Sequence, residues 1–386
     1  MRRSETRILA THAGSLPRPK GLVDLFTRAS RGERIDTKDL AEQVRAATEH
    51  VVAQQLACGI DVGNDGEQPR ESFFTYLRDR MSGFAGQSQR PAMRDLTRYP
   101  TFIERMMFEL GRPQVNLLSG PQAVADVRYT DPAPLVREMD AFAATLAVHT
   151  LTFTETFWTA PSPGIVACAM QNAHYPSLEA YVDAVADALA TEYEAIVARG
   201  HVLQIDAPDL AMERHTLFAD RPLDEFLRFV EHTVTALNRA LTRIPPHRVR
   251  LHVCWGNYEG PHVDDVDLAP LLPLVYRAHV GGLVLSMANP RHAHEHRVLA
   301  RHRLPDDWIL VAGVIDTTTN YVEHPEVVAE RLEIAARVTG DPHRVLGGTD
   351  CGFDTSAGLG QVAEEVAWEK LRALRDGAAL ASTRLL

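Results

Sequence analysis

The sequence is poor in cysteine and lacks long apolar runs. Its 386 residues include only four cysteines, at positions 58, 168, 254 and 351, which are too few for a scaffold held by disulfides. No segment approaches the roughly 20 consecutive apolar residues that a membrane-spanning helix needs. The residues after Met1 are polar and form no apolar leader. We therefore expect a cytoplasmic protein that does not bind a membrane.

A surplus of basic residues is also absent. The chain has 40 lysines and arginines against 51 aspartates and glutamates, which gives a net charge of -11. Because binding to nucleic-acid phosphates needs a basic face, we expect no nucleic-acid partner. Hydrophobic residues make up 45% of the chain and charged residues 24%, as is typical of a globular protein with a large core.

Short β-type runs alternate with amphipathic stretches along the chain. The predicted strands are Ile8–Ala13, Gly59–Asn64, Thr152–Thr159, Val202–Ala207, Val249–Cys254, Gly282–Met287, Trp308–Val314 and Arg344–Thr349. Such alternation indicates an α/β fold with a parallel sheet. The pattern favours a (β/α)8 TIM barrel that forms a single domain over residues 1–386, while a doubly wound open sheet remains an alternative.

One region does not follow the repeating unit. Residues 85–131 contain an extra β-type run, Val115–Val124, where only one connecting helix is needed. We interpret this region as an inserted hairpin or cap beside the barrel mouth. Amphipathic stretches that predict helices elsewhere include Asp267–Ala278 and Gly358–Asp376.

Polar residues follow the apolar runs, where a barrel places its active site. The candidates are His12, Ser15, Asp65, Glu67, Asp206, His252, Cys254, Asn289, His292, Asp350 and Cys351. The acidic residues Asp65, Glu67 and Asp206 suit an ammonium group, or the orientation of metal ligands; helix caps and loop salt bridges are the structural alternative. His12 and Ser15 could recognise an anion or could only form a tight turn.

His252 and Cys254 are candidates for a metal site. Residues two apart on a strand face the same side, although a histidine and a core cysteine could also serve packing alone. Cys351 follows another apolar run and supplies a third ligand, which suits Zn²⁺ with one exchangeable position. Thiolate ligands leave a bound substrate sulfur electron-rich, so this set favours alkyl transfer to sulfur over hydrolysis.

The chain resembles the cobalamin-independent methionine synthase superfamily, in particular its short single-barrel members such as epoxyalkane:coenzyme M transferase. The motifs that carry the resemblance are His12–Pro19, Asn64–Gln68, Gln204–Leu210, His252–Asn257, Ala288–His292 and Gly348–Phe353. The resemblance covers nearly the whole chain. It implies a (β/α)8 barrel with zinc at its mouth, bound by the histidine and the two cysteines named above, that activates a thiol for alkylation.

Two departures from the family pattern bear on the substrate. Ser286 stands where the methionine synthases carry a glutamate that ligates zinc, and Thr318 stands where the folate-dependent enzymes carry a histidine that delivers a proton. A serine hydroxyl is a poor zinc ligand, so the fourth position is expected to hold water or the substrate sulfur. These departures argue against folate as the donor and leave thiol activation intact.

The sequence therefore predicts a zinc-dependent transferase that takes a small-molecule thiol and an alkyl donor. His292 and Asp350 are the predicted catalytic residues, with His292 as an acid. The resemblance implies that Asp65, Glu67 and Asp206 hold the amino group of a homocysteine-like thiol, and His12, Ser15 and Asn289 complete the predicted substrate site. A metal-free barrel lyase or decarboxylase of the uroporphyrinogen decarboxylase type and a non-catalytic small-molecule or corrinoid-binding relative are the alternatives. The oligomeric state stays open, a homo-oligomer included.

Overall fold

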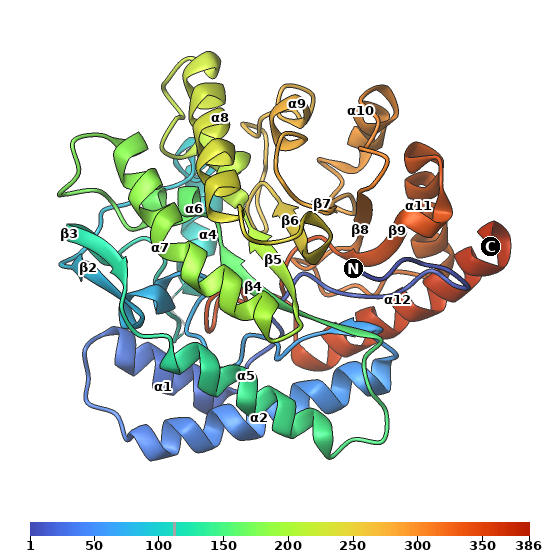
Figure 1. The fold of residues 1–386 in the computed structure, drawn as a ribbon, viewed down its shortest axis with the longest axis horizontal. Helices are drawn as coiled ribbons and strands as arrows, with labels where there is room; N and C mark the ends of the chain where they lie inside the picture. Colours follow the sequence, from blue (N-terminus) through green and yellow to red (C-terminus); the bar gives the residue numbers. More distant parts are fainter. Residues whose placement is uncertain (111–112) are drawn as a thin grey trace.

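The computed structural model describes residues 1–110 and 113–386. At its centre is a curled parallel sheet of seven strands (Figure 1). The strand order is β1-β4-β5-β6-β7-β8-β9, so neighbours in the sheet follow one another along the chain. The strands are β1 Val62–Gly63, β4 Glu155–Pro161, β5 Val202–Asp206, β6 Val249–Val253, β7 Gly282–Ser286, β8 Ile309–Ile315 and β9 Val345–Thr349. The predicted α/β fold with a parallel sheet is confirmed.

The N-terminal segment lies between the two outermost strands of this sheet. Thr11 donates its backbone N–H to the carbonyl of Gly347 in β9, and the N–H of Val62 in β1 donates to the carbonyl of Ala10. These contacts form isolated parallel bridges at Ala10 and Thr11. The predicted strand Ile8–Ala13 is therefore reduced to two bridging residues, which link β9 to β1.

Helices cover the outer face of the sheet (Figure 1). They are α1 Lys20–Ser30, α2 Thr37–Cys58, α5 Ala133–Ala147, α6 Pro163–Ala169, α7 Leu178–Ala198, α8 Leu223–Ala240, α9 Leu272–Val275, α10 His296–Arg301, α11 Pro325–Thr339 and α12 Glu364–Leu385. Among the helices of the described ranges, none combines the length and the apolar character that crossing a bilayer requires.

Side chains that alternate between the two faces of the strands divide the core into two layers. Leu283 and Leu285 pack in the large cluster between sheet and helices, whereas Val284 belongs to a smaller cluster with Phe157 from β4. Because successive strand residues face opposite sides, the sheet is buried on both faces. The guanidinium of Arg250, on β6, lies 3.9 Å from the centre of the Phe157 ring on the inner face. The residue two positions further along β6, His252, faces the same interior.

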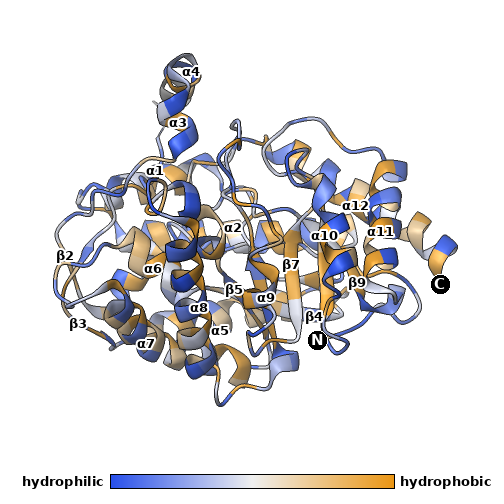
Figure 2. Ribbon diagram, turned by 90° about the horizontal axis from the view of Figure 1, so that it is seen from above, coloured by the Kyte–Doolittle hydropathy of each residue, from blue (hydrophilic) through white to orange (hydrophobic). Residues whose placement is uncertain are grey.

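A second sheet of two strands lies outside the main sheet. The strands β2 Met81–Ala85 and β3 Gln122–Tyr129 pair antiparallel, and helices α3 Arg94–Arg98 and α4 Pro100–Leu110 lie between them in the sequence. Figure 2 shows α3 and α4 standing out from the body of the protein. The predicted extra strand began at Val115, but β3 begins at residue 122, after the Ser-Gly-Pro break that ends at position 121.

Two predicted helices are shorter than expected. The stretch Asp267–Ala278 is helical only over α9, because Pro270 and Pro273 lack the N–H that a continuous helix needs. The helix predicted from Gly358 begins at Glu364, where α12 starts. Gly358 itself has a φ of +88°, a left-handed conformation that a right-handed helix does not contain.

Close contact between α11 and α12 gives a prediction on stability. A Cβ atom at Gly377 would lie 2.4 Å from the Cβ of Val328 and 2.8 Å from the carbonyl oxygen of Pro325. Alanine in place of a helical glycine gains about 1 kcal/mol, whereas overpacking costs about 1–3 kcal/mol. We expect Gly377→Ala to lower the free energy of unfolding in urea by up to about 2 kcal/mol.

The matched control lies in α1. A Cβ at Gly21 would meet only the end of the flexible Gln43 side chain, at 3.4 Å. We therefore expect Gly21→Ala to leave the free energy of unfolding unchanged or to raise it by up to about 1 kcal/mol. A stabilising Gly377→Ala would contradict the tight approach of the two helices.

Candidate metal centre

The three predicted metal ligands converge at the carboxyl ends of two strands. His252 lies on β6, Cys254 follows it, and Cys351 follows β9. Their donor atoms all lie within 4.8 Å of one another, and all three residues are buried. The spacing of two residues does place His252 and Cys254 together, and the fold adds a sulfur from nearly a hundred residues further along the chain.

Asp206, at the end of β5, orients the histidine. Nδ1 of His252 lies 2.9 Å from Oδ1 of Asp206, and the side-chain amide of Gln204 donates to the same oxygen over 2.8 Å. A proton on Nδ1 leaves Nε2 as the ligand atom, which is the arrangement in which a carboxylate holds a metal-binding histidine. Nε2 lies 3.2 Å from the carbonyl oxygen of Asp350, so binding of a metal at Nε2 would replace the proton that this contact holds.

The electrostatics of the cluster favour a thiolate beside an imidazolium. A hydrogen bond from Cys351 and the charge of His252 lower the pKa of Cys254 well below its usual value, against the effect of burial. The same hydrogen bond, together with burial, raises the pKa of Cys351. Burial alone would lower the pKa of His252, but Cys254 and Asp206 outweigh it and raise the pKa to about 10. These contacts favour the thiolate of Cys254, the form that binds a cation.

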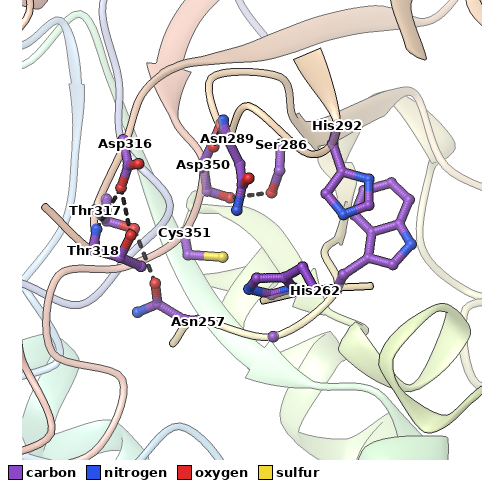
Figure 3. Close-up of a pocket in the computed structure, with 12 residues that line it drawn as sticks. Asn257, His262, Ser286, Asn289, His292, Asp316, Thr317, Thr318, Asp350 and Cys351 are labelled. Atoms are coloured by element: carbon purple, nitrogen blue, oxygen red, sulfur yellow. Dashed lines mark hydrogen bonds between the residues drawn. The ribbon is translucent and has the colours of Figure 1, made fainter. Parts of the chain in front are cut away.

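A narrow pocket opens beside Cys351 (Figure 3). Its lining residues are Trp255, Gly256, Asn257, His262, Ser286, Asn289, His292, Asp316, Thr317, Thr318, Asp350 and Cys351. Both positions that depart from the family pattern, Ser286 and Thr318, belong to this lining. Ser286 donates to the carbonyl oxygen of Asp350 over 2.9 Å, and Thr318 donates to Asp316.

The carboxylate of Asp350 is occupied by the loop that follows β7. It accepts the backbone N–H groups of Met287, Ala288 and Asn289 at 2.8, 2.9 and 2.7 Å. Burial raises the pKa of Asp350 to about 7, and the three amides oppose that rise. By accepting these three N–H groups, Asp350 fixes the loop that carries Asn289 at the pocket. The catalytic role of Asp350 stays a prediction.

His292 lies in the pocket wall with its ring stacked on Trp255. The ring centres are 3.8 Å apart and the planes meet at 16°. Nε2 of His292 lies 2.7 Å from Oδ2 of Asp265. Burial would lower the pKa of His292, but Asp265 and Glu295 raise it to about 9. The two carboxylates therefore favour the protonated ring, which is the form that an acid needs.

Asp65 and Glu67 are buried, and each leaves one carboxylate oxygen without a partner. Oδ1 of Asp65 accepts the N–H of Glu67, whose backbone has a φ of 57°, and Oε1 of Glu67 accepts the hydroxyl of Thr159. Burial raises the pKa of Asp65 to about 6, and burial with the charge of Asp206 raises that of Glu67 to about 7. Buried acceptors without donors suit a cationic group.

The predicted residues of the N-terminal loop, His12 and Ser15, form hydrogen bonds within the protein. The side chain of His12 contacts Gln55 through Nε2 at 2.8 Å and accepts the N–H of Gly14 at Nδ1, and burial lowers its pKa to about 4. The carbonyl of Ser15 accepts the N–H of Phe353. Neither residue lines the pocket beside Cys351, and their substrate-binding role stays a prediction.

Several pocket residues were not predicted, because they lie in the irregular loop between β6 and α9. Asn257 donates to the carbonyl of Gly352 and accepts the hydroxyl of Thr317, which ties this loop to those after β9 and β8. His262 and Asp265 lie in the same loop. Their only signal in the sequence is a histidine three residues before an aspartate, downstream of a strand that carries candidate ligands.

Comparisons with known proteins agree with the motifs. No family profile matches the chain. A methionine synthase from Sulfurisphaera tokodaii is 24% identical over 345 residues, which cover 89% of this chain and 85% of that protein. One from Thermococcus kodakarensis is 25% identical over 343 residues, covering 88% and 85%.

The solved structure of a B12-independent methionine synthase from a Shewanella species, in complex with selenomethionine, has the same fold. It aligns with a TM-score of 0.75 over 98% of both chains, at 20% identity. The relatives match across nearly the whole chain, and the strand ends that carry the motifs lie together in the fold. The predicted resemblance to the cobalamin-independent methionine synthase superfamily is confirmed: the chain is similar to methionine synthases over nearly its whole length.

Proposed function

We propose that this protein is a zinc-dependent transferase that activates a small thiol for S-alkylation. The observation that carries the proposal is the convergence of His252, Cys254 and Cys351 within 4.8 Å. We further propose that residues 1–386 form one (β/α)8 barrel domain, in which the bridging segment at Ala10 and Thr11 serves as the eighth strand.

The donor set fits zinc. Two cysteine sulfurs and one imidazole are ligands that zinc prefers, and three protein ligands leave one position for a substrate. When bound, zinc stabilises a substrate thiol as its thiolate at neutral pH. Asp206 fixes the tautomer of His252. The hydroxyl of Ser286 donates to the carbonyl of Asp350, so it would leave the fourth position to the substrate sulfur.

A thiol that also carries an amino group fits the neighbouring carboxylates. The unpartnered oxygens of Asp65 and Glu67 are buried acceptors, and the negative charge of Asp206 acts on Glu67. An ammonium group would satisfy them and lower their pKa values. The relatives are named methionine synthases, which supports homocysteine as the thiol and a methyl group as the transferred alkyl group.

His292 is the proposed acid on the donor side of the pocket. It holds a proton, lines the same pocket as Cys351, and is oriented by Asp265 and by the ring of Trp255. It would protonate the leaving group of the alkyl donor, or the alkoxide that forms if the donor is an epoxide. Asn289, positioned by Asp350, and the loop of His12 and Ser15 would then complete the substrate site.

The region near residues 85–131 is the proposed cap beside this pocket. The hydroxyl of Tyr258 donates to Asp95 of α3 over 3.1 Å, and Arg98 of α3 pairs with Asp264 over 3.0 Å. Both partners of α3 lie in the loop after β6 that lines the pocket.

Zinc absorption spectroscopy with candidate thiols tests the proposal. Protein loaded with zinc should show two sulfur ligands, and a third on addition of homocysteine, with release of a proton. Methionine and homoserine, which lack a free thiol, serve as controls. A sulfur count that no thiol changes would contradict thiol activation at this site.

The role of Asp206 gives a further prediction. Asp206→Ala removes the acceptor that orients His252, and loss of such an outer partner typically weakens metal affinity about 10–100-fold. Competition with a zinc chelator measures this. Asp206→Asn keeps an acceptor oxygen without the charge, so we expect a smaller loss. Equal zinc affinity in Asp206→Ala and the unaltered protein would contradict the assignment.

A further inference from the structure

Three histidines surround one carboxylate on the far side of the pocket from Cys351. Oδ2 of Asp265 lies 2.9 Å from Nδ1 of His262 and 2.7 Å from Nε2 of His292, and the other oxygen, Oδ1, lies 2.9 Å from Nδ1 of His215. The donor atoms of His262, Asp265 and His292 all lie within 4.8 Å of one another. The four side chains are at most 4% exposed.

The hydrogen bonds of His262 point to a cation between it and Asp265. Nε2 of His262 lies 3.1 Å from the carbonyl oxygen of Tyr258. A carbonyl only accepts, so Nε2 carries the proton, and in the neutral ring the lone pair of Nδ1 then faces the carboxylate of Asp265. Two acceptors in contact repel each other. Either a proton or a metal ion must lie between them.

His215 supplies an independent observation. Nδ1 of His215 pairs with Oδ1 of Asp265 over 2.9 Å, whereas Nε2 is buried without a hydrogen-bond partner. Leaving buried polar atoms without partners costs about 1–3 kcal/mol each, and an ion is one common reason for such atoms in a native protein.

We propose that His262, His292 and Asp265 bind a divalent transition-metal ion, at a second site distinct from the His-Cys-Cys centre. Metal binding needs the unprotonated ring of His292, so with this ion bound His292 is a ligand and no longer the acid of the proposed function. Two imidazoles and one carboxylate form a ligand set that first-row divalent metals occupy with open positions. Histidine and carboxylate donors bind such metals at about 2.0–2.2 Å, so donors now 2.7–2.9 Å apart need to separate by only a few tenths of an ångström.

The surroundings complete this second site. The Tyr258 carbonyl holds the other nitrogen of His262, which is the usual outer partner of a metal-binding histidine. Glu295 lies 3.8 Å from Nδ1 of His292, and Trp255 fixes the plane of that ring. Because His262 and His292 line the same pocket as Cys351 (Figure 3), an open position of the ion would face the pocket and bind an oxygen ligand there.

Metal stoichiometry separates the two sites. The unaltered protein, dialysed against Co²⁺, should bind two ions per chain. The double variant Cys254→Ser with Cys351→Ser should bind one, and the spectrum of that ion should lack the charge-transfer band of a cobalt–thiolate bond. Adding Asp265→Asn to the double variant should remove the remaining ion.

The matched control is Asp264→Asn, the acid next to Asp265, which pairs with Arg98 and is absent from the cluster; it should keep both ions. Circular dichroism and thermal unfolding check the fold of each variant, and His262→Gln replaces Asp265→Asn if that variant does not fold. One ion in the unaltered protein and none in the cysteine variant would overturn the proposal, as would an unchanged count after Asp265→Asn. A single ion in the unaltered protein that is still present in the cysteine variant would instead contradict the zinc centre and support the second site.

Discussion

Cys351→Ser is expected to abolish thiol alkylation, with a fall in rate of at least about 100-fold. Changes to outer partners of metal ligands already cost about 10–100-fold, and this change removes a ligand itself. It also changes the Cys351 side chain, whose hydrogen bond lowers the pKa of Cys254. Zinc content after dialysis and the rate of S-methylation of homocysteine measure the two losses.

Cys168→Ala is the matched control for this change. Cys168 is also free and buried, but it lies in α6 within the main apolar cluster, outside the metal centre. We expect this variant to keep its zinc and its activity, with a modest loss of stability from the small cavity. Full zinc retention in Cys351→Ser would show that the centre is not built from these three residues.

Lys370→Met is expected to lower the free energy of unfolding by about 3–5 kcal/mol. Nζ of Lys370, in α12, lies 2.9 Å from Oε2 of Glu323, and both side chains are almost fully buried, at 0% and 2% exposed. Removing one partner of such a pair leaves the other charge uncompensated in the core, which costs about 3–5 kcal/mol. Urea unfolding followed by circular dichroism measures the change.

The double variant Lys370→Met with Glu323→Gln tests this explanation. Glutamine removes the stranded charge and keeps the oxygen that accepts the backbone N–H of Asp316. Since a buried ion pair replaced as a whole is often nearly neutral, we expect the double variant to recover most of the lost stability. Equal stability of the single and the double variant would show that the loss comes from packing of the lysine side chain.

The Lys370–Glu323 ion pair, which stabilises the protein, is also linked by hydrogen bonds to the pocket wall. Glu323 holds Asp316 through its backbone, and Asp316 in turn accepts the hydroxyl of Thr318, at the pocket wall. Lys370→Met is therefore expected to loosen the loop after β8 as well as to destabilise the protein. Variants at this position need a stability measurement before a change in activity is assigned to the site.

The local order of residues was sufficient to predict which side chains lie at the ends of the strands. The period of two along β6 put His252 and Cys254 on one face, and polar residues that directly follow apolar runs marked the edge of the sheet at which β5 to β9 end. Prediction was poorer where proline or glycine interrupts a pattern. The helix expected over Asp267–Ala278 shrank to four residues for this reason.

Only the tertiary structure decided which groups meet. Asp206 contacts His252 because β5 and β6 pair in register, with these two residues opposite each other. The cluster of His215, His262, Asp265 and His292 joins three loops with no regular period, so no pattern in the sequence predicts it.

What the sequence alone determined is the α/β class, the strand ends and the chemical nature of a His-Cys-Cys set, since these follow from residue type and short-range spacing. Partners, orientation and burial depend on contacts between residues far apart in the chain, which only the folded protein specifies. The three-histidine cluster around Asp265 belongs entirely to that second group.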